Sequence, residues 1–147
     1  MILEDFMAKE LALATAAAFT GAAVYINIAE QPGRLGLDDR ALLAQWKPSY
    51  AGGFAMQASL ALACALFGLL AVWWTRDWRW FVGAALIFAN WPYTVFVILP
   101  VNKRLEKMPA EAAVNETRAL IKKWGDLHAV RAALGLAATL VFLWALN

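Results

Sequence analysis

Charged residues in this sequence are confined to short segments, and four long apolar blocks lie between them. The blocks that contain no Asp, Glu, Lys or Arg are residues 11–29, 51–74, 80–101 and 132–147. A helix needs about 20 apolar residues to cross the hydrocarbon core of a bilayer. The fourth block is short, but residues 127–131 extend it if His128 and Arg131 face protein rather than lipid. The pattern therefore predicts four membrane-spanning segments.

All four blocks are predicted to be helices rather than strands of a membrane barrel. They are continuous runs rich in Ala and Leu, without the alternation of apolar and polar residues that barrel strands show. Small residues recur every four positions, at Ala14, Ala18 and Ala22, at Ala61 and Ala65, and at Ala133 and Ala137. This spacing favours close packing between helices. We expect an all-α, integral membrane four-helix bundle with up-down-up-down topology, formed by residues 1–147 as a single domain.

The connections between the spans differ in length. Residues 75–79 form a tight hairpin that is flanked, as in an aromatic belt at a membrane surface, by Trp73, Trp74, Trp78 and Trp80. Residues 30–48 and 102–126 are predicted to be two long loops at the opposite end of the bundle. Each contains an amphipathic segment, at residues 38–46 and 110–123. We expect these two loops to cover that end of the bundle as a lid.

The composition excludes several classes of protein. Hydrophobic residues make up 63% of the 147 residues and charged residues only 16%, against roughly 45–50% and about 25% in an ordinary soluble domain. This rules out a soluble globular enzyme, a disordered chain and a coiled coil. The net charge of +2, with dispersed basic residues, gives no indication of nucleic-acid binding. The single cysteine, Cys64, excludes an internal disulfide and a multi-cysteine metal site.

Basic residues favour one orientation in the membrane. The loops at 30–48 and 102–126 carry nine Lys and Arg residues, whereas the N-terminal segment and the hairpin carry three. Because cytoplasmic loops are enriched in Lys and Arg, we predict that both loops are cytoplasmic and that both termini lie outside. The expected location is the cell membrane, with the lipid bilayer surrounding a multi-pass protein.

Polar side chains at the membrane boundary gather at the end that carries the long loops. The first three spans contribute Tyr25, Asn27, Glu30, Trp46, Tyr50 and Asn102. The fourth begins with Trp124, His128 and Arg131, whose i, i+4, i+7 spacing places them on one helix face. Such a face offers an aromatic wall, an imidazole that titrates near neutral pH and a fixed cation. The alternation of the spans should bring all these residues to one membrane face.

The residues alone leave two interpretations of this cluster open. His128 and Arg131 are candidates for a catalytic or binding site. Alternatively, an ion pair between Arg131 and Glu30 or Asp126 would simply hold the helices together, since a charge in a membrane needs a partner. Both interpretations predict that these side chains are buried between helices.

Two further features bear on chemistry. A metal site is disfavoured because the chain has one histidine and no clustered cysteines, and we expect neither a bound metal nor another cofactor. In the third span, Asn90, Trp91 and Pro92 predict a kink with a polar lining. The simpler explanation is a proline kink whose freed carbonyl is satisfied by Thr94 or by a neighbouring helix.

Four short sequences resemble those of the anthrone oxygenase-like membrane proteins. They are IAEQP at residues 28–32, WKP at 46–48, PVNKRL at 100–105 and WGDLHAVR at 124–131. The resemblance covers nearly the whole chain and is most specific in the Pro-x-Asn and Trp-x-x-Leu-His-x-x-Arg patterns. It implies a four-helix membrane bundle. In fungal relatives it also implies oxidation of a polycyclic anthrone to an anthraquinone by dioxygen, without an established metal or flavin.

The resemblance also implies a set of site residues. Asn102, Trp124, His128 and Arg131 match the family's motif, with Glu30 and Trp46 as companions. Because an anthrone is acidic at its benzylic carbon, a base alone can form the carbanion that dioxygen oxidises. His128 would be the base, and Arg131 or Asn102 would stabilise the enolate oxygen. Trp46 and Trp124 would stack on the rings.

We therefore hypothesise a membrane oxidoreductase, a monooxygenase of the anthrone oxygenase type, that oxidises a lipophilic aromatic or quinol-like compound without a cofactor. The predicted catalytic residues are His128, Arg131, Asn102 and Glu30. The predicted substrate-binding residues are Trp46, Trp124, Tyr25, Tyr50 and Asn27. The alternative is a non-catalytic binding or structural membrane protein whose Glu, His and Arg cluster holds the bundle together. A transporter is disfavoured because the sequence shows no inverted repeat, and a homo-oligomer is left open.

Overall fold

The computed structural model describes residues 2–147, with side chains from Met7 onward, and the regular structure in this range is helical. The first span comprises α1 (Ile2–Tyr25), the π-helical turn η1 (Ile26–Glu30) and α2 (Gln31–Leu35), and the second is α3 (Asp39–Thr75). The third comprises α4 (Trp78–Phe88), α5 (Asn90–Tyr93), the π-helical turn η2 (Thr94–Ile98) and α6 (Leu99–Lys107). A 3-10 turn, η3 (Ala110–Ala112), leads to the fourth span, α7 (Asn115–Leu146).

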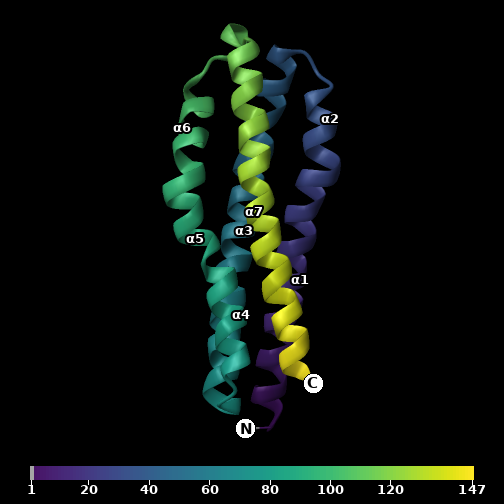
Figure 1. Cartoon of the computed structure of the whole chain (residues 1–147), viewed down its shortest axis with the longest axis vertical. Helices are drawn as coiled ribbons and strands as arrows, with labels where there is room; N and C mark the ends of the chain where they lie inside the picture. The colour runs from purple at the N-terminus through teal and green to yellow at the C-terminus, as the bar shows by residue number, and fades with distance from the viewer. Residues whose placement is uncertain (1) are drawn as a thin grey trace.

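These spans form the predicted all-α, up-down-up-down membrane bundle. Four stretches of the described residues are long and apolar enough to cross a bilayer: Met7–Leu35, Asp39–Thr75, Trp78–Lys107 and Asn115–Leu146. Figure 1 shows them side by side, with both chain ends at one end of the bundle and the turns after α2 and α6 at the other. The protein is thus a multi-pass membrane protein. Its orientation and its location in the cell membrane stay predictions.

The two long connections are mostly helical, which corrects the prediction of a lid made of loops. Of residues 30–48, only the turn at 36–38 lies outside a helix, and in the second connection only residues 108–114 interrupt the long helices. The amphipathic segments extend the spanning helices because their apolar faces find partners on neighbouring helices. Together they form an upper core of Leu42, Leu43, Trp46, Ile98, Val101, Leu105, Ile121 and Trp124. This core closes the end of the bundle that the loops were expected to cover.

Two prolines account for the π-helical turns in the first and third spans. Pro32 and Pro100 each follow a π-helical turn by two residues. A proline has no N–H for the carbonyl four residues earlier and its ring crowds that carbonyl. The affected carbonyls belong to Ile28 and Phe96, which lie inside η1 and η2. The helices widen there instead of ending, so Pro32 continues the first span rather than starting a loop.

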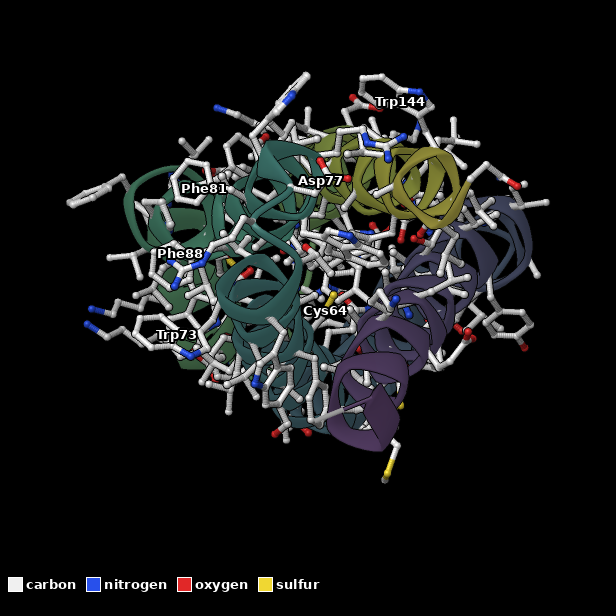
Figure 2. All side chains as sticks on the ribbon, turned by 90° about the horizontal axis from the view of Figure 1, so that it is seen from below. Cys64, Trp73, Asp77, Phe81, Phe88 and Trp144 are labelled. Atoms are coloured by element: carbon white, nitrogen blue, oxygen red, sulfur yellow. The ribbon has the colours of Figure 1, made fainter. Side chains whose placement is uncertain are left out.

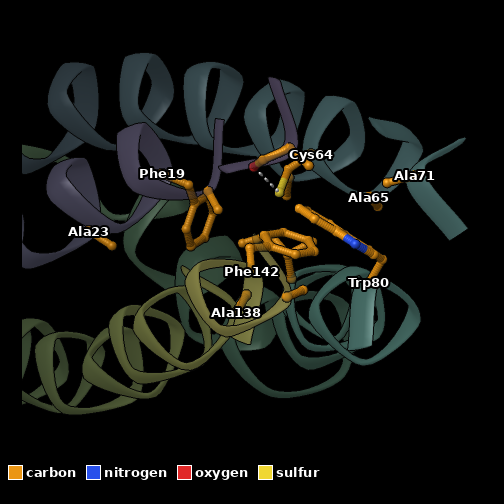
Figure 3. Packing of buried hydrophobic residues seen from close by; sticks show 13 residues of the cluster. Phe19, Ala23, Cys64, Ala65, Ala71, Trp80, Ala138 and Phe142 are labelled. Carbon is orange, nitrogen blue, oxygen red and sulfur yellow. Dashed lines mark hydrogen bonds between the residues drawn. The ribbon is translucent and has the colours of Figure 1, made fainter. Parts of the chain in front are cut away.

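The lower core lies between the hairpin and the middle of the bundle. Figure 3 shows Phe142 of α7 packed between Phe19 of α1 and Trp80 of α4. The Cys64 thiol donates a hydrogen bond to the carbonyl oxygen of Ala12 in α1. Figure 2 shows Trp73, Phe81 and Phe88 on the outside of the bundle, where they are 49–66% exposed. Trp80 is 1% exposed, so it belongs to the core and not to the predicted aromatic belt.

The small residues at helix contacts differ in part from those predicted. Ala61 and Ala65 are buried, as expected, whereas Ala14, Ala18 and Ala133 are exposed. The small residues that are buried in α1 and α7 instead include Ala8, Ala12, Ala16, Ala23, Gly135 and Ala138. Spacing of four occurs on more than one face of an alanine-rich helix, so spacing alone does not select the buried face.

The hairpin is tied to the end of the fourth span. Arg79 donates to the carbonyl oxygens of Trp144 at 2.6 Å and Ala145 at 3.5 Å, in the last turn of α7. Its guanidinium also hydrogen-bonds to the Asp77 carboxylate at 2.9 Å, and this contact holds the pKa of Asp77 below its usual value. Arg79 therefore places a cation at the negative end of the α7 dipole and joins the hairpin to the last turn of α7.

We predict that Gly83→Ala destabilises the bundle. An added Cβ at Gly83 would overlap the ring of Phe142 and come within 3 Å of three of its atoms. Overpacking of this kind costs about 1–3 kcal/mol, so the melting temperature in detergent should fall. Gly21→Ala is the matched control, because a Cβ there meets nothing within 4 Å, and it should leave the melting temperature unchanged or raise it. A Gly83→Ala protein that melts with the native protein would contradict this packing.

Candidate functional site

A polar pocket lies between all four spans, below the upper core. The unfilled space between its lining residues is about 360 Å³, including the part that is open to the outside. Its polar or charged lining residues are Glu30, Arg34, Ser49, Tyr50, Gln57, Thr94, Asn102, Trp124, His128 and Arg131. The structure thus brings Glu30, Asn102, His128 and Arg131 around one pocket, although the chain separates Glu30 from Arg131 by 101 positions.

A chain of hydrogen bonds fixes the state of the His128 ring. Nδ1 of His128 lies 2.8 Å from Oδ1 of Asn27, and Nδ2 of Asn27 donates to the carbonyl oxygen of Gly125 at 2.9 Å. A carbonyl only accepts, so the amide nitrogen of Asn27 must face Gly125 and its oxygen must face His128. Nδ1 therefore carries the proton and donates a hydrogen bond to Oδ1 of Asn27. In the neutral imidazole Nε2 is then left with its lone pair, which makes it a base.

Glu30 belongs to a network that links the first two spans. Its Oε1 accepts from Arg34 at 2.5 Å, from Gln45 at 3.2 Å and from the Ser49 hydroxyl. Arg34 follows Glu30 by one helical turn, and its guanidinium lies over the ring of Trp124 at 5.5 Å. The carboxylate of Glu30 thus positions Arg34, and the helix must continue through Pro32 for the two to pair.

Arg131 is a buried cation without a carboxylate partner among the described side chains. It is 7% exposed, its Nε has no hydrogen-bond partner among them, and its guanidinium lies 5.5 Å from the centroid of the Phe19 ring. The Tyr50 hydroxyl lies near its guanidinium and near the Asn102 side chain. The predicted pairing with Glu30 does not form, because Glu30 is engaged by Arg34, and Asp126 is exposed on the outside of α7.

Aromatic rings form one wall of the pocket. Trp124 stacks on His128 with ring centroids 5.1 Å apart, and Trp46 meets the edge of Trp124 at 5.8 Å. Trp46 also stacks on Tyr50 at 4.8 Å and is fully buried. Trp46 therefore supports the wall from behind, while Trp124 and Tyr50 face the pocket.

Three of the predicted substrate-binding residues, Trp46, Tyr25 and Asn27, lie outside the pocket lining. Trp46 is fully buried behind Trp124 and Tyr50 and so cannot stack on a substrate as predicted. Tyr25 is 63% exposed on the surface of the bundle. It follows the buried Ala23 by two positions, which is about 200° around an α-helix, and so points outward. Asn27 lies behind His128 and orients its ring rather than facing the pocket.

Four polar residues of the pocket were not among the predicted site residues: Arg34, Ser49, Gln57 and Thr94. Gln57 is 1% exposed, and neither atom of its amide has a hydrogen-bond partner in the described part of the chain. Thr94 is 7% exposed, with its hydroxyl equally unpartnered there. Arg34 was counted only as a loop charge. A lone glutamine within an apolar block is a signal that was present, because such a residue is costly in a membrane unless it has a function.

The residues of the pocket do not combine into a metal centre. No group of three His, Cys, Asp or Glu side chains that could hold a metal ion occurs among the described residues. His128 is the only histidine of the chain, and its Nδ1 is occupied by Asn27. The expectation of a metal-free protein stays a prediction.

Comparison with known proteins connects this pocket to one family. A family model described as anthrone oxygenase matches residues 46–141, which include Asn102, Trp124, His128 and Arg131. An anthrone oxygenase of Claviceps purpurea (strain 20.1) is 30% identical over 112 residues, which cover 68% of this chain and 64% of that protein. The match therefore spans just under two thirds of the relative's length. No solved structure matches the chain.

Proposed function

Because the chain belongs to the anthrone oxygenase family, we propose that it is an enzyme that oxidises a lipophilic aromatic compound with dioxygen in the polar pocket, without a cofactor. The substrate class is an anthrone or a related compound with an acidic benzylic C–H bond; a quinol, which has no such bond, would instead give a quinone and hydrogen peroxide. The observation that carries the proposal is that one pocket brings together His128, whose Nδ1 is held by Asn27 so that Nε2 is the basic nitrogen of the neutral ring, and a buried arginine without a carboxylate partner among the described side chains. A base beside an unpaired cation is suited to forming and holding an organic anion.

The proposed reaction begins with proton transfer. Nε2 of His128 removes a proton from the benzylic carbon, and the electron pair left behind is delocalised onto the substrate carbonyl oxygen as an enolate. The carbanion reduces dioxygen, a C–O bond forms, and the resulting peroxide takes the proton from the imidazolium. His128 then removes the second benzylic proton, the O–O bond breaks, and hydroxide leaves with that proton as water. The sum is anthrone plus dioxygen to anthraquinone plus water.

Arg131 and Asn102 are proposed to divide the recognition of the substrate's oxygens between them. Arg131 has an N–H group without a partner among the described side chains and would stabilise the enolate oxygen. The Asn102 amide already interacts with Tyr50, and its buried Oδ1 has no donor among the described residues. Asn102 would therefore accept a hydrogen bond from a substrate hydroxyl.

The remaining residues are proposed to shape the pocket. Trp124 would stack on the aromatic rings of the substrate, as it does on His128. Glu30 is less suited to be the base, because its Oε1 accepts from Arg34, Gln45 and Ser49. We assign it to positioning Arg34. This network is the one observation that favours the non-catalytic interpretation, and it leaves His128 and Arg131 unexplained.

The proposal is tested by measuring dioxygen consumption. We expect the protein in lipid nanodiscs to oxidise emodin anthrone, with equal amounts of dioxygen consumed and anthraquinone formed. Lipid-only nanodiscs are the control, because anthrones also oxidise spontaneously. Formation of hydrogen peroxide in place of water would show oxidase chemistry instead. Rates no faster than the control with both anthrones and hydroquinones would overturn the proposal.

A further inference from the structure

A second cavity lies deeper in the bundle, beside the break between α4 and α5. Its unfilled space is about 390 Å³, including the part that is open to the outside, and Phe54, Ala58, Asn90, Thr94 and Val95 are among the residues that line it. Its lining residues on the second and third spans belong to the apolar blocks at 51–74 and 80–101. Phe54 and Val95 are 38% and 44% exposed, so this second cavity reaches the surface that the spans present to lipid. We refer to it as the membrane cavity.

The membrane cavity contains buried polar groups that the protein leaves unpaired. Nδ2 of Asn90 donates to the carbonyl oxygen of Ile87 at 3.0 Å, whereas Pro92 frees the carbonyl of Phe88. The Thr94 hydroxyl has no hydrogen-bond partner among the described residues, so the predicted role of Thr94 in satisfying that carbonyl is wrong. Oδ1 of Asn90, the hydroxyl of Thr94 and Nε1 of Trp91 have no hydrogen-bond partner among the described residues. Asn90 is 2% and Thr94 7% exposed. Their residues line the cavity, and hydrocarbon cannot satisfy such groups, so they favour a ligand that can.

The pattern of these groups indicates the chemistry of the ligand. Asn90 offers its unpaired acceptor Oδ1, while one of its two amide hydrogens donates to Ile87. Trp91 offers only a donor, and the hydroxyl of Thr94 can do either. A hydroxyl group on the ligand both donates and accepts, whereas a bare hydrocarbon does neither. The apolar remainder of the cavity suits an aromatic skeleton.

The membrane cavity adjoins the polar pocket. Phe54, Thr94 and Arg131 line both. The buried side chains of the upper core pack the bundle on the side away from the chain ends. A molecule dissolved in the bilayer would therefore reach Arg131 from the side, between α3 and the kinked third span.

We propose that the membrane cavity binds a hydroxylated aromatic compound from the bilayer and delivers it to the polar pocket. Its hydroxyl donates to Oδ1 of Asn90 and accepts from the Thr94 hydroxyl, with Nε1 of Trp91 as a further donor. That this compound is the substrate rests on the proposed function, whereas the binding site itself does not. The membrane cavity is thus both a binding site and the access route to His128.

Photolabelling tests the site without turnover. The probe is 4-hydroxybenzophenone in nanodiscs under argon, with labelled peptides located by mass spectrometry. We expect labels at residues 54–61 and 90–99. Ala58→Trp fills the cavity and should reduce this labelling about tenfold, equivalent to roughly 1.4 kcal/mol of binding. Ala55→Trp is the matched control, because Ala55 is exposed on the same helix and is not part of the lining, and it should label like the native protein.

A second comparison removes one polar group of the cavity, the Thr94 hydroxyl, without adding bulk. Thr94→Val should weaken labelling by 4-hydroxybenzophenone and leave labelling by benzophenone, which has no hydroxyl, unchanged. Labels that persist in Ala58→Trp, or that occur only outside residues 54–61 and 90–99, would overturn the proposal even in a protein that oxidises anthrones. Specific labelling in a protein without oxidation would instead retain the site and reject the proposed function.

Discussion

Replacing Arg131 with methionine should leave the melting temperature of the protein in detergent unchanged or raise it, while lowering kcat/KM for anthrone oxidation about 10²–10³-fold. Arg131 is 7% exposed and has no carboxylate within salt-bridge distance among the described side chains, so folding buries its charge without an ion pair. A methionine of similar length removes that desolvation cost. The activity falls because the developing enolate loses its cation.

A matched replacement separates this prediction from a purely structural role. Arg34→Met removes the partner of Glu30, which lies 2.5 Å away and is 19% exposed. Breaking a fully buried pair costs about 3–5 kcal/mol, and a partly exposed one less, so this variant should melt at a lower temperature. If Arg131→Met melts as low as Arg34→Met, Arg131 holds the bundle together and the non-catalytic interpretation gains. If Arg131→Met retains full activity, the anion site is wrong.

The membrane spans and the clustering of the site residues could be predicted, because both follow from the requirements of an apolar bilayer. Charge-free blocks of about 20 residues leave little choice of structure in a bilayer. Four such blocks, joined in sequence, bring residues as distant as Glu30 and His128 to one end of a bundle. The roles of those residues are not determined by this argument.

The course of the chain beyond the apolar blocks was not predictable in the same way. Pro32 and Pro48 are ordinary markers of a loop, yet both lie in helices of this structure. A π-helical turn accommodates Pro32, and the upper core supplies apolar partners for the segments that follow. Such packing is a property of several segments at once, so no single segment reveals it. Arg34 became a site residue only because its helix continues from Glu30.

Side-chain roles depend on helical phase and on individual hydrogen bonds, which position along a span does not give. Tyr25 and Asn27 are two residues apart at the same membrane boundary, but one faces outward and the other bonds to His128. The buried residues of α1 lie on one helix face up to Ala23. If the helix had been known to continue beyond α1, this face would have indicated that Tyr25 points outward. The contact between Asn27 and Gly125 depends on how closely two helices approach. Gly125 permits that approach, since a Cβ there would lie 2.6 Å from Nε2 of Gln31.

Replacing His128 with glutamine should lower kcat for anthrone oxidation about 10²–10⁴-fold, the usual contribution of a general base. Glutamine keeps hydrogen-bonding groups in the buried site but supplies no base, so the fold should be retained and the melting temperature should stay close to that of the native protein. The comparison with Arg131→Met is informative, because the two variants remove different parts of one step. A His128→Gln protein with native turnover would place the chemistry elsewhere.

The protonation of His128 can be observed directly, because it is the only histidine in the chain. In protein labelled with ¹⁵N-histidine, we expect NMR signals of a neutral ring protonated at Nδ1, held so by the 2.8 Å contact with Oδ1 of Asn27. Asn27→Leu removes that acceptor, and the ring should then shift toward the tautomer protonated at Nε2, which has no lone pair facing the substrate. Loss of such an orienting contact typically costs 10–100-fold, by analogy with partners of metal-bound histidines, so turnover should fall by about that factor. A merely structural Asn27 would lower stability and leave the tautomer unchanged. Protonation at Nε2 in the native protein would exclude His128 as the base.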